Sequence, residues 1–477
     1  MATSELTRRR RFGILAICSM SLFIVGLDIT AVNVALPTIG RELDASLSWL
    51  QWSVSAYTVA MASFLMLAGS IADRVGRRRT LTIGLGVFTA ASALCALAPT
   101  VELLVAARVL QGIGASMLNP VAMSIITNTF MDRSERAQAV GVWGAVFGAS
   151  MALGPIVGGG LVATAGWQWI FAINIPLGLT AIALLRRFVP ESRAPSPRRF
   201  DPAGQAFVVV LLAGVTYAII EGPGSGWGAP SIVAALIAAA GSLTGLVVVE
   251  SRRDEPLIDL RFFGSVPFSS SIALSVAGFA SFGGFLFLGT LYLQDARGAS
   301  PVEAGLVVMP IALMTVMLSP VSGRLVGRSG PRLPLLIAGV SFLLASSMLA
   351  GLSAQTPLAW ILAAYAVFGV GFGFINAPIT NAAISGMPVA QAGVAAAIAT
   401  TSRQFGQAIG VAVVGAIVAS GSTSSAAALA SATHPAWWTL TALGALVLGL
   451  GVLATTDRAR ASARRTALQL NPEAAAA

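Results

Sequence analysis

The chain has 477 residues, of which 56% are hydrophobic and only 10% are charged, and its mean hydropathy is +0.83. Soluble globular domains carry about 25% charged residues, so this composition excludes a soluble protein and indicates an integral membrane protein. All 29 basic residues are arginines, and the net charge of +10 is better explained by membrane topology than by nucleic-acid binding.

Apolar segments long enough to cross a bilayer recur along the whole chain. A spanning helix needs ~20 mostly apolar residues. On this criterion the sequence predicts fourteen helices, at residues 12–37, 48–72, 80–98, 101–127, 137–163, 168–185, 205–220, 231–249, 267–293, 303–321, 333–352, 358–380, 391–419 and 436–454. The first is too long for a signal-peptide core and lacks a cleavage signal, so we expect it to stay as a membrane helix.

The distribution of arginines predicts the orientation. Arg108 and Arg403 fall inside predicted helices. Of the others, 25 lie on the side of the N-terminus and only Arg41 and Arg297 lie opposite. Because arginine is enriched in cytoplasmic loops, and because an even number of helices returns the chain to its starting side, we expect both termini in the cytoplasm.

Two sequence patterns occur twice. GSIADRVGRRR (69–79) is echoed by GRLVGRSGPR (323–332), and GIGASMLNP (112–120) by GVGFGFINAP (369–378). The similar offsets predict two parallel six-helix copies. We therefore expect an N-terminal six-helix bundle (1–200), an inserted two-helix pair with linker (201–262), and a C-terminal six-helix bundle with a cytoplasmic tail (263–477). The Pro- and Arg-rich stretch 186–201 is predicted to be a cytoplasmic linker. Two such halves around a midplane site are typical of transporters.

Several motifs appear in order at suitable helix positions: LDITAVNVALP (27–37), the 69–79 segment, RVLQGIGAS (108–116), GASMALGPIVGGG (148–160), WQWIFAINIPLG (167–178) and YLQDARGASPVEAG (292–305). With them the chain resembles the major facilitator superfamily, specifically its fourteen-helix drug:proton antiporter branch of the multidrug and quaternary ammonium resistance type. The resemblance implies an all-α membrane fold of two six-helix bundles with two additional central helices. It also implies that hydrophobic, often cationic, small molecules are exported in exchange for protons by alternating access.

One carboxylate, Asp28, lies in a long apolar run far from a helix end. Such residues face a protein interior or a water-filled cavity. Asp28 is ~14 Å from the outer end of the first helix, and Arg108 is ~10 Å from the outer start of the fourth, so the two lie at similar depth. Burial opposes ionisation whereas a nearby guanidinium favours it. We predict that Asp28 and Arg108 couple proton movement to transport; the alternative is a static buried pair.

Other motif residues are predicted to control conformation. In the 69–79 loop, Gly76 permits a tight turn with positive φ, and we expect this loop to lock the two halves together through Gly69, Asp73, Arg74, Gly76 and Arg77. The alternative is that its arginines only follow the positive-inside rule. The second copy carries Gly327 in place of Asp73, so its lock looks incomplete.

The fifth helix carries a glycine run with a proline, and we expect a bend at Gly154, Pro155 and Gly158 where the halves meet. Ordinary tight packing of small residues is the alternative.

Candidates for lining the substrate cavity are polar or aromatic residues within the helices: Asn33, Trp52, Tyr57, Gln111, Gln294 and Arg403. Arg403 lies near the midplane and either faces the cavity or satisfies backbone carbonyls. The aromatic series at Phe279, Phe282, Phe285, Phe287 and Tyr292 is expected to face mostly lipid or core. His434 is predicted to lie in an external loop, and Cys18 and Cys95 are expected to be packing residues.

The sequence contains no motif that indicates an enzyme. The GxG strings lie in mid-membrane rather than after a strand, and there is no Walker loop, no zinc-ligand spacing and no plausible Ser–His–Asp set. We therefore expect no enzyme, no cofactor and no metal, with transport driven by the proton gradient. The expected partners are small amphipathic substrates, protons and the lipid bilayer, with no nucleic acid. We expect a monomer in the bacterial cytoplasmic (inner) membrane.

Three alternatives stay open at this point. The chain is also compatible with an exporter of a lipid or lipid-linked precursor, or with an exporter of a self-made antibiotic. A non-transporting membrane sensor or scaffold is an alternative of another class, against which the short loops and the missing soluble domains count.

Overall fold

The computed structural model describes residues 7–194, 201–253, 256, 258–385, 387–421 and 425–470. These residues form helices and connecting turns, and no strand occurs among them. Fourteen helices in the described chain are long and apolar enough to cross a membrane, as the sequence predicted. In hydrocarbon every backbone N–H and C=O needs an internal partner, and an α-helix provides one within a single segment.

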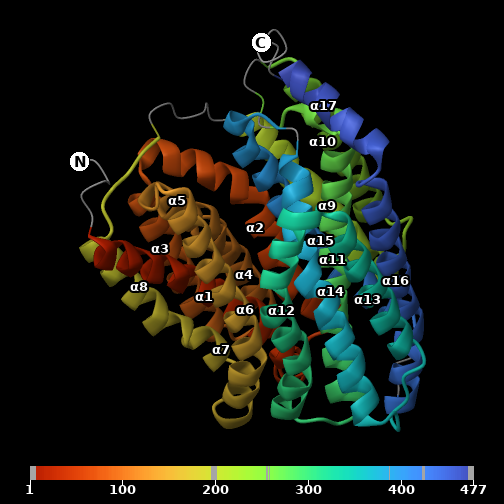
Figure 1. The fold of residues 1–477 in the computed structure, drawn as a ribbon. Helices are drawn as coiled ribbons and strands as arrows, with labels where there is room; N and C mark the ends of the chain where they lie inside the picture. Colours follow the sequence, from red (N-terminus) through yellow and green to blue (C-terminus); the bar gives the residue numbers. More distant parts are fainter. Residues whose placement is uncertain are drawn as a thin grey trace. The chain divides into compact units, whose positions relative to one another are not determined.

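Two compact units are present: Met1–Phe200 with Ala299–Leu306, and Asp201–Gly298 with Val307–Ala477. The helices of the first unit (Figure 1) are α1 (Arg8–Glu42), α2 (Leu47–Val75), α3 (Arg77–Ala96), α4 (Val101–Ser116), α5 (Leu118–Thr129), α6 (Arg133–Thr164), α7 (Trp169–Ala172) and α8 (Asn174–Phe188). Helices α4 and α5 together make one span, as do α7 and α8. The predicted domain limits at residues 200 and 262 stay predictions.

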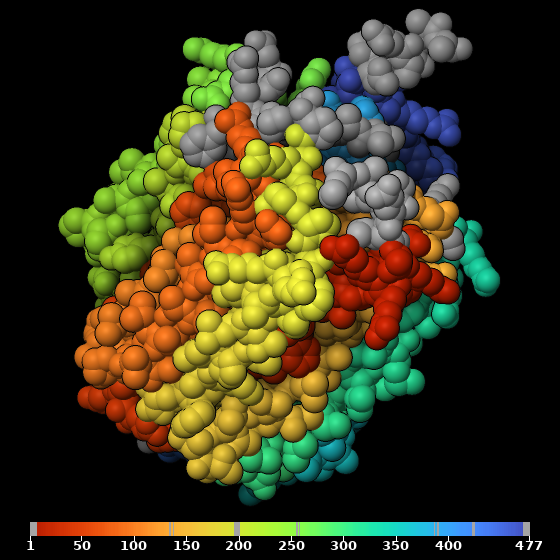
Figure 2. All heavy atoms as spheres, turned by 90° about the vertical axis from the view of Figure 1, so that its left-hand side faces the viewer, coloured from red at the N-terminus to blue at the C-terminus, as the bar shows by residue number. Residues whose placement is uncertain are grey.

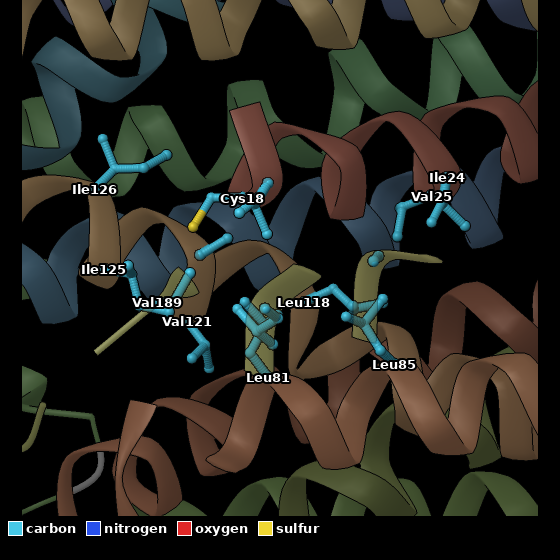
Figure 3. Close-up of a cluster of buried hydrophobic side chains, with 14 of the residues drawn as sticks. Cys18, Ile24, Val25, Leu81, Leu85, Leu118, Val121, Ile125, Ile126 and Val189 are labelled. Carbon is cyan, nitrogen blue, oxygen red and sulfur yellow. The ribbon is translucent and has the colours of Figure 1, made fainter. Parts of the chain in front are cut away.

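The core of the first unit is a cluster of aliphatic side chains from several helices. Cys18 of α1, Leu81 and Leu85 of α3, and Leu118 and Ile125 of α5 are all buried in it (Figure 3). Helix α8 packs against α3, and Figure 2 shows this face with α8 in yellow and α3 in orange. Both cysteines are buried free thiols, in agreement with a packing role.

The second unit contains the remaining elements: α9 (Pro202–Ser225), α10 (Pro230–Glu250), η2 (Leu260–Gly264), α11 (Val266–Leu291), η3 (Tyr292–Ala296), α12 (Pro301–Ser329, which begins in the first unit), α13 (Arg332–Leu349), α14 (Leu358–Ile384), α15 (Val389–Ala419), α16 (Ala426–Leu453) and α17 (Asp457–Leu470). Helices α9 and α10, which correspond to the predicted inserted pair, pack against each other, and α9 also packs against α15.

Equivalent glycines bring helices together in both sequence copies. A Cβ atom at Gly114 of α4 would lie 2.6 Å from the backbone nitrogen of Phe88 in α3. A Cβ atom at Gly371 of α14 would lie 2.7 Å from Cδ1 of Phe342 in α13. Small residues at such positions allow close helix approach within a membrane. The two copies therefore use the repeated glycines in the same way.

Two predictions about the chain need correction or restriction. His434 does not lie in a loop, because α16 begins at Ala426 and runs through it; its Nε2 lies 2.7 Å from the carbonyl oxygen of Leu352. The alanine-rich start of this helix, which also contains Ser431 and His434, is less hydrophobic than the rest, so the hydropathy criterion did not detect its first turns. Residues 195–200 of the predicted linker and 471–477 of the tail lie outside the described residues.

The glycine run of α6 packs against α1. A Cβ atom at Gly154 would overlap the side chain of Thr30, and one at Gly158 would lie 2.9 Å from Cβ of Ala31. Helix α6 continues through Pro155 without interruption. The close approach of α6 to α1 thus depends on these two glycines, whereas the bend at the junction of the halves stays a prediction.

Gly158 and Gly160 provide a matched test of this packing. A Cβ atom at Gly160 would meet nothing within 4 Å. We expect Gly158→Leu to cost about 1–3 kcal/mol through overpacking and to abolish transport, while the protein still inserts in the membrane. Gly160→Leu, on the same helix, should keep both stability and transport. Melting temperature in detergent and flux in vesicles measure the two effects, and a Gly158→Leu protein that behaves like Gly160→Leu would contradict the packing argument.

Candidate functional site

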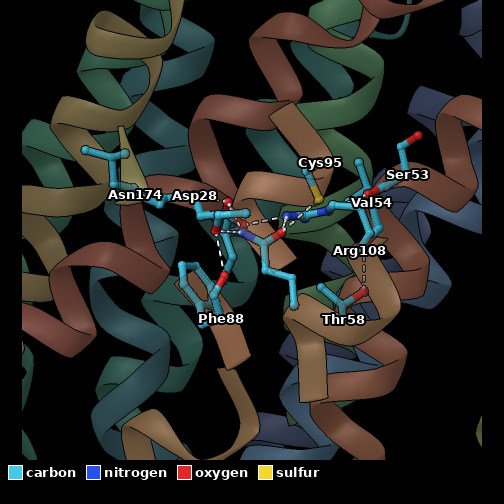
Figure 4. A network of polar contacts seen from close by, with 12 residues as sticks. Asp28, Ser53, Val54, Thr58, Phe88, Cys95, Arg108 and Asn174 are labelled. Carbon is cyan, nitrogen blue, oxygen red and sulfur yellow. Dashed lines mark hydrogen bonds and ion pairs between the residues drawn. The ribbon is translucent and has the colours of Figure 1, made fainter. Parts of the chain in front are cut away.

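A buried ion pair joins α1 to α4 in the first unit. The Nη1 atom of Arg108 donates to Oδ2 of Asp28 at 2.6 Å. Asp28 is 0% exposed and Arg108 only 1%. Figure 4 shows the two side chains meeting between helices, with Asn174 beside them. The sequence argument placed both residues at similar depth, and the structure brings them into contact.

Two amide groups complete the surroundings of the carboxylate. Gln111 donates from Nε2 to Oδ1 of Asp28 at 2.9 Å, and Asn174 of α8 donates from Nδ2 to the same oxygen at 3.1 Å. Gln111 lies three residues after Arg108, so one face of α4 presents both side chains. The Nε2 group of Gln111 also donates to Oγ of Ser92 in α3 at 2.8 Å. This buried network therefore spans four helices through side chains alone.

The guanidinium of Arg108 has further partners besides Asp28. Its Nε donates to the carbonyl oxygen of Ser53 in α2 at 2.9 Å, and Nη1 also donates to Oε1 of Gln111 at 2.6 Å. The ring of Tyr57 lies 4.2 Å from the guanidinium carbon, a cation–π distance. An arginine held by an acceptor at each end and stacked on a ring has one orientation, which fixes its distance from Asp28.

The arrangement matches an ionised carboxylate. Arg108, Gln111 and Asn174 all act as donors to Asp28, and no acceptor for a carboxyl proton faces it among the described hydrogen bonds. Protonating Asp28 would remove the charge that holds Arg108 and would require one donor to turn away. We therefore expect the charge state of this residue to affect the packing of α1, α4 and α8.

Removal of one charge from the pair tests how much the pair contributes to the free energy of unfolding. We expect Arg108→Met to destabilise the protein by about 3–5 kcal/mol, because it leaves an ionised carboxylate buried without its counter-ion. The double variant Asp28→Asn with Arg108→Met should recover most of that loss, since no buried charge is left. Melting temperatures in detergent measure both. Equal losses in the single and the double variant would show that the pair is not coupled.

The four predicted cavity residues of the first unit lie in two kinds of surroundings. Tyr57 and Gln111 are both 0% exposed and belong to the network around Asp28. Asn33 is 4% exposed and donates from Nδ2 to the carbonyl oxygen of Ile29 in its own helix. Trp52 is partly exposed on α2. The structure thus brings two candidates to the ion pair, and a cavity role for all four stays a prediction.

The second unit contains the remaining candidates. Gln294 lies in η3 and is 7% exposed. Arg403 of α15 is partly exposed and donates from Nη2 to Oγ1 of Thr380 at 2.6 Å. Most members of the aromatic series are core residues, as expected: Phe285, for example, stacks on Phe368 at a ring distance of 4.0 Å. Arg403 therefore lies beside a set of buried aromatic side chains, with Phe279 5.8 Å from its guanidinium carbon.

The 69–79 loop has the turn that the sequence predicted. Gly76 adopts φ +124° between α2 and α3, and Arg77 donates from Nη2 to Oδ1 of Asp73 at 3.2 Å. Arg74 is exposed at the end of α2. A Cβ atom at Gly69 would meet nothing within 4 Å, so that glycine is not needed for packing in this conformation. A role of the loop in conformational change stays a prediction.

Sequence reasoning missed the residue that supports this loop, because that residue lies 113 positions after Arg78 in the chain. The carboxylate of Glu191, which follows α8, accepts hydrogen bonds from the backbone nitrogens of Arg78 at 2.9 Å and Arg79 at 3.2 Å. The backbone nitrogen of Arg77 donates to the carbonyl oxygen of Ser192 at 2.9 Å. A carboxylate at a helix N-terminus satisfies free N–H groups and complements the helix dipole. Its distance in sequence left no local signal.

Glu191 is therefore expected to stabilise the start of α3. We expect Glu191→Ala to lower stability by about 1–3 kcal/mol, since two backbone donors lose a charged acceptor. Asp457→Asn is the control, because that carboxylate is 97% exposed in its ion pair and should contribute little. The melting temperatures of both variants test this expectation. Similar values would show that Glu191 does not stabilise the start of α3.

Known proteins resemble this chain over most of its length. The Major Facilitator Superfamily model matches residues 18–411. The multidrug resistance protein Stp of Mycobacterium tuberculosis is 36% identical over 400 residues, covering 84% of this chain and 74% of that protein. The tetracenomycin C resistance and export protein of Streptomyces glaucescens is 36% identical over 421 residues, covering 87% and 77%. The multidrug efflux pump LfrA of Mycolicibacterium smegmatis is 33% identical over 417 residues, covering 86% and 81%.

Solved structures show the same architecture at low sequence identity. The peptide transporter POT in complex with sulfate aligns with a TM-score of 0.67 and 18% identity, covering 96% of this chain and 95% of that one. The partially occluded inward-open xylose transporter XylE from E. coli aligns with a TM-score of 0.64 and 16% identity, covering 92% and 96%. The fold that the motifs implied is confirmed: the chain is a multi-pass membrane protein that belongs to the major facilitator superfamily.

Proposed function

We propose that this protein is a proton-coupled exporter of hydrophobic small molecules, including drugs and antibiotics, that works by alternating access. The observation that carries the proposal is the fully buried Asp28, held by Arg108, Gln111 and Asn174 across α1, α4 and α8. Relatives whose names describe multidrug efflux and antibiotic resistance, at 32–36% identity, support the substrate class.

The proposed cycle uses the charge state of Asp28 as its switch. In the ionised state the carboxylate holds Arg108 and closes the contacts among the helices of the first unit. Proton uptake weakens this pair and releases the donors, which favours a second arrangement of α1 and α4. Two arrangements that differ in proton affinity make the protonation of Asp28 and the conformational equilibrium mutually dependent.

The proton gradient supplies enough free energy for this work. One proton moving across ~150 mV gives about 3.5 kcal/mol, which corresponds to a concentration ratio of a few hundred. The proposal needs no cofactor. It places the protein in the bacterial cytoplasmic membrane as a monomer, with both termini in the cytoplasm, in accord with the arginine distribution.

An apolar groove in the first unit suits a hydrophobic substrate. The groove is open and has a volume of about 460 Å³; eight residues of α1 and α6 line it, namely Phe12, Leu15, Ala16, Ser19, Met20, Phe23, Val142 and Val146. Arg8–Arg11 precede these residues on α1, so the groove lies near the end of α1 that we assign to the cytoplasm. A substrate that partitions into the inner leaflet meets this end of the helix first.

The coupling role of Asp28 is tested by flux in proteoliposomes with an imposed pH gradient. We expect Asp28→Asn to abolish proton-driven accumulation of a transported dye, because the side chain no longer titrates. Downhill movement of the same dye should persist, since Asn keeps the size of the residue and the helices stay assembled. Asp28→Glu should retain partial coupling. Uphill transport by Asp28→Asn at the parental rate would contradict the proposal.

A further inference from the structure

Arg403 is a cation inside the second unit without a carboxylate partner. Among the described residues no acid lies within ion-pair distance of it. Arg108, the other arginine far from a helix end, is neutralised by Asp28. An uncompensated guanidinium at membrane depth is costly, and such residues generally mark a ligand pathway or a partner.

The hydrogen-bonding capacity of Arg403 is only partly used. Its Nη2 donates to Oγ1 of Thr380 at 2.6 Å and to the carbonyl oxygen of Asn376 at 3.5 Å, both on α14. Its Nε is buried and has no hydrogen-bond partner, and within the described chain Nη1 makes no hydrogen bond either. A guanidinium has five N–H donors, so several remain for an acceptor that the protein does not supply.

Buried aromatic rings pack beside the guanidinium. The ring of Phe279 on α11 is 5.8 Å from the guanidinium carbon of Arg403. Phe279 also contacts Phe372 of α14 at a ring distance of 5.5 Å, and Phe372 stacks on Phe282 at 4.2 Å. These rings are at most 7% exposed and pack against one another, so the free guanidinium donors are the groups that a charged ligand would meet.

We propose that Arg403 binds an anionic group, a carboxylate or an ionised phenol, of an exported substrate. The inference rests on the proposed export function and names its substrate class, which differs from the cationic preference that the sequence resemblance implied. Electrostatics favour it, because the buried pair in the first unit is neutral while Arg403 carries a net positive charge into the membrane interior. The inside-negative membrane potential also favours outward movement of an anion.

A dye pair that differs by one charge tests the proposal. Rhodamine B carries a free carboxylate, and its ethyl ester does not, while the aromatic system is the same. We expect the purified wild-type protein to bind rhodamine B by fluorescence anisotropy. Arg403→Gln should weaken that binding about tenfold or more and change binding of the ester less than about twofold. Arg403→Lys should fall between, because it keeps the charge and loses the planar donor fork.

Thr380→Val separates ligand binding from a structural role. It removes the side-chain acceptor that holds Arg403 and leaves the guanidinium in place, so binding of rhodamine B should persist. If Arg403 serves only to tie α15 to α14, Thr380→Val and Arg403→Gln should lower the melting temperature together and affect both dyes equally. That result, or equal affinity of Arg403→Gln and wild type for rhodamine B, would overturn the proposal.

Transport is measured separately from binding, in vesicles with a pH gradient. If either dye is exported in response to the gradient but Arg403→Gln binds both dyes as tightly as wild type does, the export function stands and the anion site is contradicted. Charge-selective binding that depends on Arg403 without gradient-driven flux of either dye would keep the anion site and contradict the export function. Absence of both binding and flux in the wild type would contradict both.

Discussion

A buried ion pair between Asp28 and Arg108 is the interaction on which the first unit depends. Neither partner reaches solvent, and in surroundings of low polarity each charge is tolerated only because the other is within hydrogen-bond distance. Gln111 and Asn174 satisfy the remaining capacity of the carboxylate, and Ser53 that of the guanidinium. A helix that moved alone would leave a charge unpaired, so the helices that carry these residues are expected to move together.

The close packing around the pair makes that constraint effective. Gly154 and Gly158 allow α6 to approach α1 closely, and Gly114 does the same for α4 and α3. With little free space between backbones, we expect a change in the charge of Asp28 to shift helix positions rather than to rearrange side chains locally. At the far end of α2 and α3, Glu191 fixes the 69–79 loop through the backbone of Arg78, and so connects the same helices at the membrane surface.

Much of the fold could be predicted from sequence, because a bilayer imposes simple rules on length and hydrophobicity. The fourteen spans follow from those rules, and the depth of Asp28 and Arg108 follows from helix geometry. The partners Asn174, Ser53 and Glu191 could not be predicted, since contacts between distant helices leave no periodic signal. The placement of His434 was wrong because a weakly hydrophobic first turn does not mark the beginning of a helix.

Substrate-induced proton release from the purified protein tests the central claim most directly. The measurement uses a pH-sensitive dye in weakly buffered detergent solution near neutral pH, with a transported compound added to the parent and to Asp28→Asn. If proton binding at Asp28 drives the exchange, the parent releases protons on substrate addition and Asp28→Asn releases none, although both still bind the compound. Equal proton release from the two proteins would show that Asp28 is a static structural residue and that the coupling group lies elsewhere.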